Sequence, residues 1–207
     1  LLRLSEGESV NAVLPVHDFE IGSSVMMCTR KGVVKKTSIG EFSRPRKGGI
    51  RAIGLREKDE LVGVRLSSGT DDLIIATRNG NAVKFNERDV RNMGRNAGGV
   101  RGVTLGKDGN VVSMSRCGEG SSLFTITENG YGKRTKLDAY RLIKRGGKGV
   151  RNIIANERNG KVVGAVVVDE SDGLILMSKN GVVIRTKAKD IGCIGRNTQG
   201  VRVMKML

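Results

Sequence analysis

Apolar runs separated by short glycine turns recur along the whole chain, and this pattern predicts β-hairpins. Three Asn-Gly turns and one Lys-Gly turn each separate two runs of about six residues, which are rich in β-branched and aliphatic side chains. Asn-Gly favours a two-residue turn of type I′, in which both residues have positive φ. The sequence therefore predicts four hairpins, over Val25–Arg30 with Val33–Thr37, Leu73–Arg78 with Asn81–Asn86, Leu123–Glu128 with Tyr131–Lys136, and Leu174–Lys179 with Val182–Lys187.

The hairpins belong to a repeat of about fifty residues. The turn glycines at positions 32, 80, 130 and 181 are 48, 50 and 51 residues apart. A second glycine, followed by a β-branched residue and Arg, recurs at positions 49, 99, 149 and 200. Each unit also contains a third predicted strand, over Val10–Val13, Leu61–Val64, Val111–Met114 and Val162–Ala165.

About four short strands per unit are typical of a propeller blade. Thirty glycines but only two prolines are consistent with many tight turns. We therefore predict an all-β, propeller-like fold of four units, at approximately 1–51, 52–101, 102–151 and 152–207. No linker rich in Pro, Gly or Ser divides these units, so we predict a single domain over 1–207.

The net charge indicates the kind of partner. The chain has 37 Lys and Arg against 21 Asp and Glu, a formal net charge of +16 and a pI of about 10.3, so we expect a polyanion as partner. Aromatic residues make up only 3% of the chain, which leaves little surface for stacking on unpaired bases. Duplex DNA is therefore the expected partner.

The positive charge recurs at fixed places in the repeat. Cations stand at the third and fourth residues after the turn glycine, and in the loop before the second glycine. For the Arg that follows the second glycine, at 51, 101, 151 and 202, two roles fit equally well. It can contact phosphate, or its aliphatic stem can cover the blade while its guanidinium pairs with a neighbouring carboxylate. The predicted DNA-contacting residues are Lys35, Lys36, Arg44, Arg46, Lys47, Lys84, Arg91, Arg95, Lys133, Arg134, Arg141, Lys144, Arg145, Lys148, Arg185 and Arg196.

Units arranged around an axis would place these cations in a belt around a rim. Such a belt contacts phosphates and carries no base code, so we expect sequence-tolerant binding and bending of the duplex. A propeller scaffold that binds acidic proteins through the same rim remains the alternative, and the salt dependence of duplex binding separates the two.

Catalytic chemistry is not predicted for this chain. His17 is the only histidine, there is no Cys-x-x-Cys pair, and the run Arg145–Gly149 lacks the Ser or Thr and the spacing of a P-loop. Asp71 and Asp72 are interpreted as turn formers, not as a metal pair. Tyr131 and Tyr140 lie inside the repeat, so we expect neither to be a catalytic nucleophile. We expect no active site, metal or cofactor in this chain.

Cysteine usage and hydropathy indicate the compartment. Cys28, Cys117 and Cys193 are odd in number and widely separated, which predicts reduced thiols, at apolar strand positions, in a cytoplasmic protein. No apolar run approaches the roughly 20 residues that span a bilayer. The chain begins with Leu1 and is expected to be a fragment.

Several segments resemble the C-terminal domain of DNA gyrase A, the gyrase protein that cleaves DNA. They recur in phase and cover essentially the whole chain: Met93–Gly102, Asn129–Thr135, Ile143–Gly149 and Ile194–Val201. The resemblance implies a β-pinwheel, whose blades exchange a strand and around whose rim DNA wraps. It also implies a role in ATP-dependent negative supercoiling. The implied partners are the N-terminal cleavage domain of gyrase A itself and the gyrase B protein, with ATP and Mg²⁺ bound elsewhere in the holoenzyme.

The chain departs from the family pattern in two ways. The family usually has six blades, whereas four units are present here. Its seven-residue box, Gln-basic-Arg-Gly-Gly-basic-Gly, normally lies in the first blade; Ile143–Gly149 matches six of the seven positions but lies in a late unit. We interpret this segment as a blade loop that resembles the box. The corresponding protein of topoisomerase IV, which has a shorter pinwheel without a box, is the nearest alternative.

Overall fold

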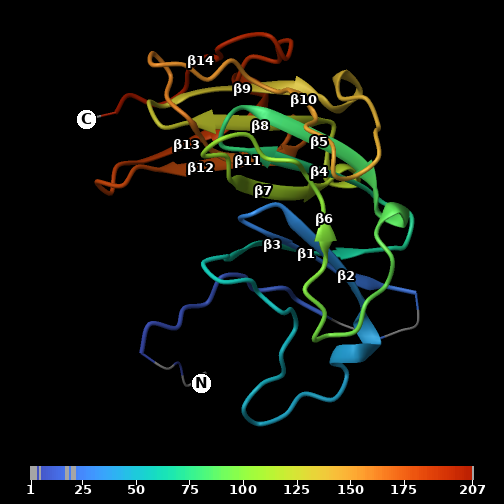
Figure 1. Cartoon of the computed structure of the whole chain (residues 1–207). Coiled ribbons are helices and arrows are strands. Elements are labelled where there is room, and N and C mark those ends of the chain that lie inside the picture. The colour runs from blue at the N-terminus through green and yellow to red at the C-terminus, as the bar shows by residue number, and fades with distance from the viewer. Residues whose placement is uncertain (1–3, 5, 17–18, 20–21, 207) are drawn as a thin grey trace.

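A computed structural model describes residues 4, 6–16, 19 and 22–206, and in them the chain is all-β (Figure 1). Each predicted hairpin is present, and the strand ends differ from the predicted ones by at most two residues. The hairpin strands are β1 (Ser24–Thr29) with β2 (Val33–Ser38), β4 (Asp72–Thr77) with β5 (Asn81–Asn86), β8 (Ser122–Thr127) with β9 (Tyr131–Lys136), and β12 (Gly173–Met177) with β13 (Val183–Lys187).

The remaining elements are six strands and five short 3-10 helices. The third strand of a unit is present as β3 (Leu61–Ser67), β7 (Val111–Arg116) and β11 (Val162–Val168), and the strand after the second glycine as β6 (Val100–Arg101), β10 (Val150–Arg151) and β14 (Val201–Arg202). The 3-10 helices are η1 (Ile39–Phe42), η2 (Glu87–Asp89), η3 (Cys117–Glu119), η4 (Leu137–Ala139) and η5 (Ala188–Asp190).

Strands from distant parts of the chain complete three of the four sheets. These sheets have the orders β3-β1-β2-β6, β10-β5-β4-β7 and β11-β8-β9-β14, and β12-β13 form a two-stranded sheet. Each of the first three hairpins therefore pairs on one side with a strand of the following unit, and on the other with a two-residue strand still later in the chain. This exchange is the β-pinwheel arrangement, and the predicted fold class is confirmed.

Two predicted strands are absent. Val10–Val13 and the segment at Ile50 and Arg51 have no strand structure. The equivalent segments elsewhere pair with the hairpin of the preceding unit, and the described residues contain no hairpin before β1. These two segments therefore have no sheet to join.

The hairpin turns differ from the predicted type I′. Only the glycine has positive φ, 83° at Gly80 and 76° at Gly130, and the Asn before it does not. The turn is a three-residue loop closed by a hydrogen bond from the Gly80 amide to the Thr77 carbonyl (3.0 Å). This geometry is the other common hairpin solution, a turn followed by a left-handed glycine. The prediction of type I′ was wrong because the loop contains one more residue than was assumed.

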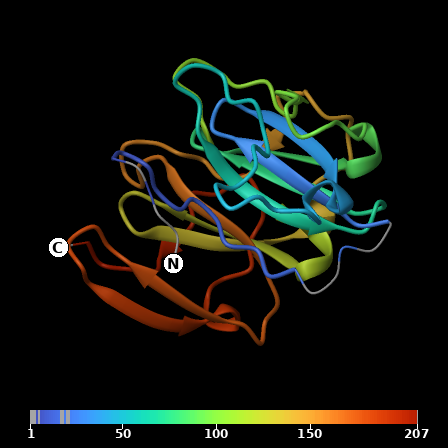
Figure 2. The ribbon, with the colours of Figure 1, turned by 90° about the horizontal axis from the view of Figure 1, so that it is seen from below.

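The hydrophobic core lies between successive sheets (Figure 2). One cluster joins Met26, Cys28 and Val34 of the first sheet to Leu73 and Phe85 of the second, and two further clusters fill the next two interfaces. Neighbouring residues on a strand point to opposite faces. The middle sheets therefore bury both faces, which explains why β4 and β11 are nearly continuous apolar runs.

The second glycine of the repeat marks a close contact between units. Gly149 has a φ of 76°, and a Cβ there would overlap the carbonyl of Ala82 on β5. Gly147, in the same loop, has no positive φ and no atom closer than 3.5 Å to such a Cβ. We expect Gly149→Ala to lower the free energy of unfolding by about 2–4 kcal/mol, because strain and overlap add.

Gly147→Ala is the matched control for that substitution. It should change stability by less than about 1 kcal/mol, since the backbone is unstrained there. Urea unfolding of the two variants checks both values. Equal losses at the two positions would show that the contact with Ala82 has no special role.

Candidate nucleic-acid interface

The basic loops dock at equivalent places on successive sheets. In the second, third and fourth loops one backbone amide donates to a carbonyl of the second hairpin strand of the preceding unit. These bonds join Met93 to Lys36 (2.8 Å), Ile143 to Lys84 (2.9 Å) and Ile194 to Arg134 (2.9 Å). The fold thus repeats one loop position from sheet to sheet, and the cations of the loops repeat with it.

Twelve of the sixteen predicted residues have exposed or half-buried side chains. Lys84, Arg95, Arg145 and Arg196 are half-buried. The exposed ones are Arg44, Arg46, Lys47, Arg91, Arg141, Lys144, Lys148 and Arg185. These twelve remain candidates for phosphate contact.

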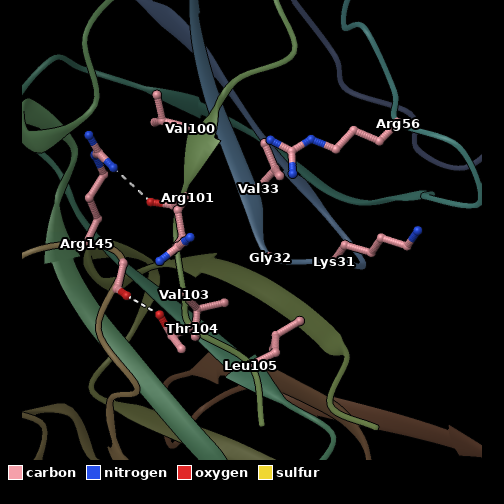
Figure 3. Close-up of a pocket in the computed structure, with 11 residues that line it drawn as sticks. Lys31, Gly32, Val33, Arg56, Val100, Arg101, Val103, Thr104, Leu105 and Arg145 are labelled. Atoms are coloured by element: carbon pink, nitrogen blue, oxygen red, sulfur yellow. Dashed lines mark hydrogen bonds between the residues drawn. The ribbon is translucent and has the colours of Figure 1, made fainter. Parts of the chain in front are cut away.

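Two of the half-buried arginines also hold the loops in place. The Arg145 guanidinium donates to the carbonyls of Arg101 (2.9 Å) and Asp89 (2.8 Å), as Figure 3 shows for Arg101. Arg196 repeats the contact one unit later, with the carbonyl of Arg151 (3.1 Å). A guanidinium has five donors, so both can still present N–H groups to an anion.

Lys35 and Lys133 lie in the interior, which corrects their prediction as DNA contacts. Both are fully buried. The Lys133 ammonium donates to the carbonyls of Gly195 (2.6 Å) and Arg196 (3.1 Å), and Lys35 donates to the carbonyls of Ala52 (2.6 Å) and Arg95. The strand period turns these side chains inward, where they position the segments that carry the exposed cations.

Burial lowers the pKa of Lys133 from 10.5 to about 8, and the nearby Arg196 guanidinium adds to this shift. Between pH 8 and 10.5 the unfolded chain then binds more protons at this residue than the folded chain does. Stability should therefore gain from Lys133 as the pH rises through this window. We expect ¹⁵N NMR of the Lys133 amine to show a midpoint near pH 8. A midpoint near 10.5 would contradict the burial of the charge.

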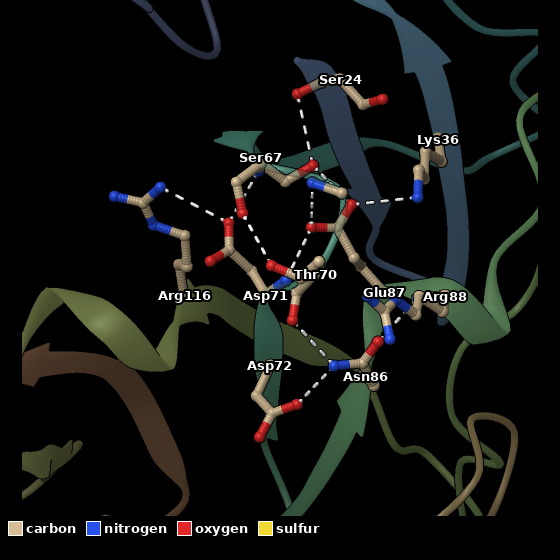
Figure 4. Close-up of polar contacts among 12 residues, drawn as sticks. Ser24, Lys36, Ser67, Thr70, Asp71, Asp72, Asn86, Glu87, Arg88 and Arg116 are labelled. Carbon is tan, nitrogen blue, oxygen red and sulfur yellow. Dashed lines mark hydrogen bonds and ion pairs between the residues drawn. The ribbon is translucent and has the colours of Figure 1, made fainter. Parts of the chain in front are cut away.

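Lys36 and Arg134 are also buried, and their prediction as DNA contacts is corrected in the same way. Arg134 donates to the carbonyl of Ile191 (3.0 Å) and lies 3.4 Å from the Glu170 carboxylate. The Lys36 ammonium lies 3.1 Å from the carboxylate of Glu87, whose side chain is fully buried (Figure 4). Both cations bind groups of the following unit.

Glu87 joins three segments through its carboxylate. Besides Lys36, it accepts hydrogen bonds from the Ser67 hydroxyl and from the amides of Gly69 and Asp71, each at 2.8 Å (Figure 4). The sequence interpretation missed this residue, although a signal was available. Glu87 occupies the position after the hairpin where the other units have Ile39, Leu137 and Ala188. An acid in an apolar column of a repeat indicates a buried partner.

The arginines after the second glycine are exposed, and one of them contacts an aromatic ring. The Arg202 guanidinium donates to the Tyr131 hydroxyl (3.0 Å), and Arg158 lies over the same ring at 5.0 Å from its centroid. The hydrogen bond from Arg202, then that from Arg158, lowers the pKa of Tyr131. The Arg202 guanidinium thus contacts a tyrosine, and the expected pair of this arginine with a carboxylate is not found within the described residues.

The other tyrosine is buried. The Tyr140 hydroxyl donates to Asn152 (2.5 Å), whose amide donates to Thr125 (2.9 Å), and burial raises the pKa of Tyr140. Asp71 lies in its turn, as predicted, and accepts a hydrogen bond from the Ser68 amide (2.9 Å). Asp72 is instead the first residue of β4, and its carboxylate accepts from the Asn86 side chain on β5 (2.8 Å).

The cysteines are free thiols, as predicted, but only one lies at an apolar strand position. Cys28 is buried in β1, Cys117 is half-buried in η3, and Cys193 is exposed in a loop. Burial raises the pKa of Cys117 to about 11. The expected strand positions of Cys117 and Cys193 were wrong, because both residues follow strands in the segments that connect blades.

No group of three His, Cys, Asp or Glu residues in the described part of the chain could hold a metal ion. Its helices are all too short to cross a bilayer. His17 lies outside the described residues.

A family comparison assigns this fold. The profile of the family described as DNA gyrase C-terminal domain, beta-propeller, matches residues 23–68, 71–117, 121–169 and 174–207. The chain belongs to this family. The four matched segments each contain one hairpin, so the family repeat coincides with the repeat in the sequence.

Curated relatives and solved structures agree with this assignment. The chain is 48% identical over 206 residues to DNA gyrase A of Salmonella typhimurium and 45% identical over 205 residues to that of Escherichia coli; each alignment covers 99% of this chain and 23% of the relative. A solved DNA gyrase A C-terminal domain superposes with a TM-score of 0.89 at 27% identity, over 100% of this chain and 69% of that one. The C-terminal domain of DNA topoisomerase IV gives 0.87 at 29%, over 93% and 60%. The chain thus spans about a quarter of the full-length gyrase A proteins.

Proposed function

We propose that this chain binds duplex DNA without sequence preference and bends it along its basic loops. The observation that carries the proposal is the repeated docking of three loops, which places the half-buried Arg95, Arg145 and Arg196 at the same position of successive sheets, with exposed cations beside them. The twelve exposed or half-buried candidates supply the phosphate contacts. Lys35, Lys36, Lys133 and Arg134 supply the framework beneath them.

The chemistry of this surface suits a phosphate backbone. Its contacts are lysine and arginine side chains, most of them on loops, and contacts of such side chains with phosphates carry no sequence information. Bending a short duplex costs several kcal/mol, which many phosphate contacts can offset. Membership of the gyrase family supports the same function.

Within a whole gyrase A protein, we propose that the domain presents a wrapped DNA segment for ATP-dependent negative supercoiling. The N-terminal cleavage domain of gyrase A and the gyrase B protein are the proposed partners, in the cytoplasm, and they supply the ATP and Mg²⁺ chemistry. Identities of 45% and 48% to gyrase A proteins support gyrase over topoisomerase IV.

The salt dependence of duplex binding tests the proposal. If about eight phosphates are neutralised, log K should fall with log[salt] at a slope near −7. Two duplexes of unrelated sequence should give the same slope and affinity. A slope near zero would contradict DNA binding through the loops and favour a scaffold for acidic proteins, which should then compete with the duplex.

A further inference from the structure

A cavity of about 850 Å³ lies beside the third basic loop, and Arg145 of that loop is one of the residues that line it (Figure 3). Its walls come from the first hairpin turn, β6 and the segment after it, and the third basic loop. Such a volume is in the range of small-molecule sites. Four of the eleven residues that line it are basic, namely Lys31, Arg56, Arg101 and Arg145, and none is acidic.

Two of these cations have no protein partner for their charged groups. Arg145 is held by backbone carbonyls, and the Lys31 ammonium donates to the carbonyl of Glu57 (2.7 Å). The guanidiniums of Arg56 and Arg101 make no hydrogen bond or ion pair within the part of the chain that the structure describes. Arg56 and Arg101 both line the same cavity, and in Figure 3 the Arg56 side chain extends toward Val33.

The acids near Arg56 in sequence do not neutralise this cavity. Glu57, the next residue, forms no ion pair within the described residues. The Asp59 carboxylate accepts from the amides of Lys31 and Glu60 (both 2.9 Å), and the Glu60 carboxylate pairs with Arg30 at 3.1 Å. The positive charge of Arg56 and Arg101 therefore faces the cavity without a counter-charge from its walls.

The repeat shows that this charge is specific to one position. Asn79 replaces Lys31 in the next unit, and Gly106 replaces Arg56, whereas Arg151 and Arg196 remain at the positions of Arg101 and Arg145. The next unit thus folds with only two of the four cations at this position. Lys31 and Arg56 are therefore additional cations, which the fold itself does not need, at the contact between the first two sheets.

We propose that this cavity is a binding site for an oligophosphate group. Arginine pairs with phosphate oxygens through two parallel N–H bonds, and two unpartnered guanidiniums, with the Lys31 ammonium on the same cavity, match the charge of a pyrophosphate. The group comes either from a free di- or triphosphate or from adjacent phosphates of bound DNA. The site does not depend on the proposed wrapping of DNA, because a free anion can test it.

Calorimetric titration of the whole chain with pyrophosphate tests the site. We expect one saturable site, with affinity lowered at least 10-fold by Arg56→Gln and by Arg101→Gln. Arg151→Gln is the matched control, since it removes the equivalent arginine from the next unit, and should lower affinity by less than 2-fold. NMR signals of the Arg56 and Arg101 Nε–H groups should shift on saturation.

A short duplex added as competitor distinguishes the two sources of phosphate. If DNA occupies the site, the duplex displaces pyrophosphate, and Arg101→Gln weakens duplex binding more than Arg151→Gln does. If a free oligophosphate is the ligand, duplex affinity is the same in both variants. Absence of saturable binding, equal losses in all three variants, or malonate binding as tight as pyrophosphate would overturn the proposal.

Discussion

Replacing Arg141, Lys144 and Lys148 by alanine together is expected to weaken duplex binding by about 100- to 1,000-fold at 0.1 M salt. Each phosphate contact contributes a slope of about −0.9, so the loss of three should reduce the slope of log K against log[salt] from about −7 to about −4.5. All three side chains are exposed. The free energy of unfolding should therefore change by less than about 1.5 kcal/mol in total. Arg145 is left in place, because its guanidinium holds two backbone carbonyls.

A second triple variant, with the same net charge as the loop triple, distinguishes an effect of the loop on DNA binding from an effect of the overall charge of the chain. The control positions are the exposed Lys107, Lys161 and Lys179. Lys179 lies in the turn between β12 and β13, the Lys107 carbonyl accepts a hydrogen bond from Asn79 of another hairpin turn, and the Lys161 amide donates to Glu128. Replacement of the three lysines by alanine should lower affinity far less than the loop triple does. Equal losses in the two triples would show that binding follows total charge alone, and that the repeated loop is not the interface.

Glu87→Gln is expected to lower the free energy of unfolding by about 3–5 kcal/mol. The substitution leaves the buried Lys36 ammonium without its counter-charge, and breaking one side of a buried ion pair has a cost of that size. The cooperative transition should move to lower urea concentration without a change in slope. Because Glu87 also ties Ser67, Gly69 and Asp71 together, the loss should loosen the contact between the first two sheets.

Two further variants identify the cause. Lys36→Met together with Glu87→Gln should be more stable than the sum of the single losses predicts, because the uncompensated charge is gone. Glu60→Gln removes an exposed partner, since the Arg30–Glu60 pair has side chains 48% and 62% exposed, and should cost less than about 1 kcal/mol. A small loss for Glu87→Gln, similar to that of Glu60→Gln, would contradict a buried pair.

Repetition made much of this fold predictable from the sequence. The two glycine series indicated the hairpins and the two-residue strands, because Gly99, Gly149 and Gly200 each meet a carbonyl of a hairpin strand at a place with no room for a side chain. What one unit predicted could be checked against the next. The turn type was not recovered, because an Asn-Gly pair fits both a two-residue loop and the last two residues of a three-residue loop.

Charge recurrence alone could not separate interface from interior. Lys35 and Lys133 share their repeat position with Val83 and Ile184, and these apolar residues indicate that the position faces inward. Lys36 was harder to place, since Lys84, at the equivalent position, is only half-buried. The deciding contact, with Glu87, joins two units and is visible only once the sheets are stacked.

Energy transfer between dyes at the two ends of a duplex of about 50 base pairs tests the central claim most directly. Such a duplex is well below the persistence length of roughly 150 base pairs and stays nearly straight when free. Binding of this chain should raise the transfer efficiency. The Arg141, Lys144 and Lys148 triple variant, compared at saturation, should give a smaller rise. Saturated binding that leaves the end-to-end distance unchanged would contradict bending around the basic loops.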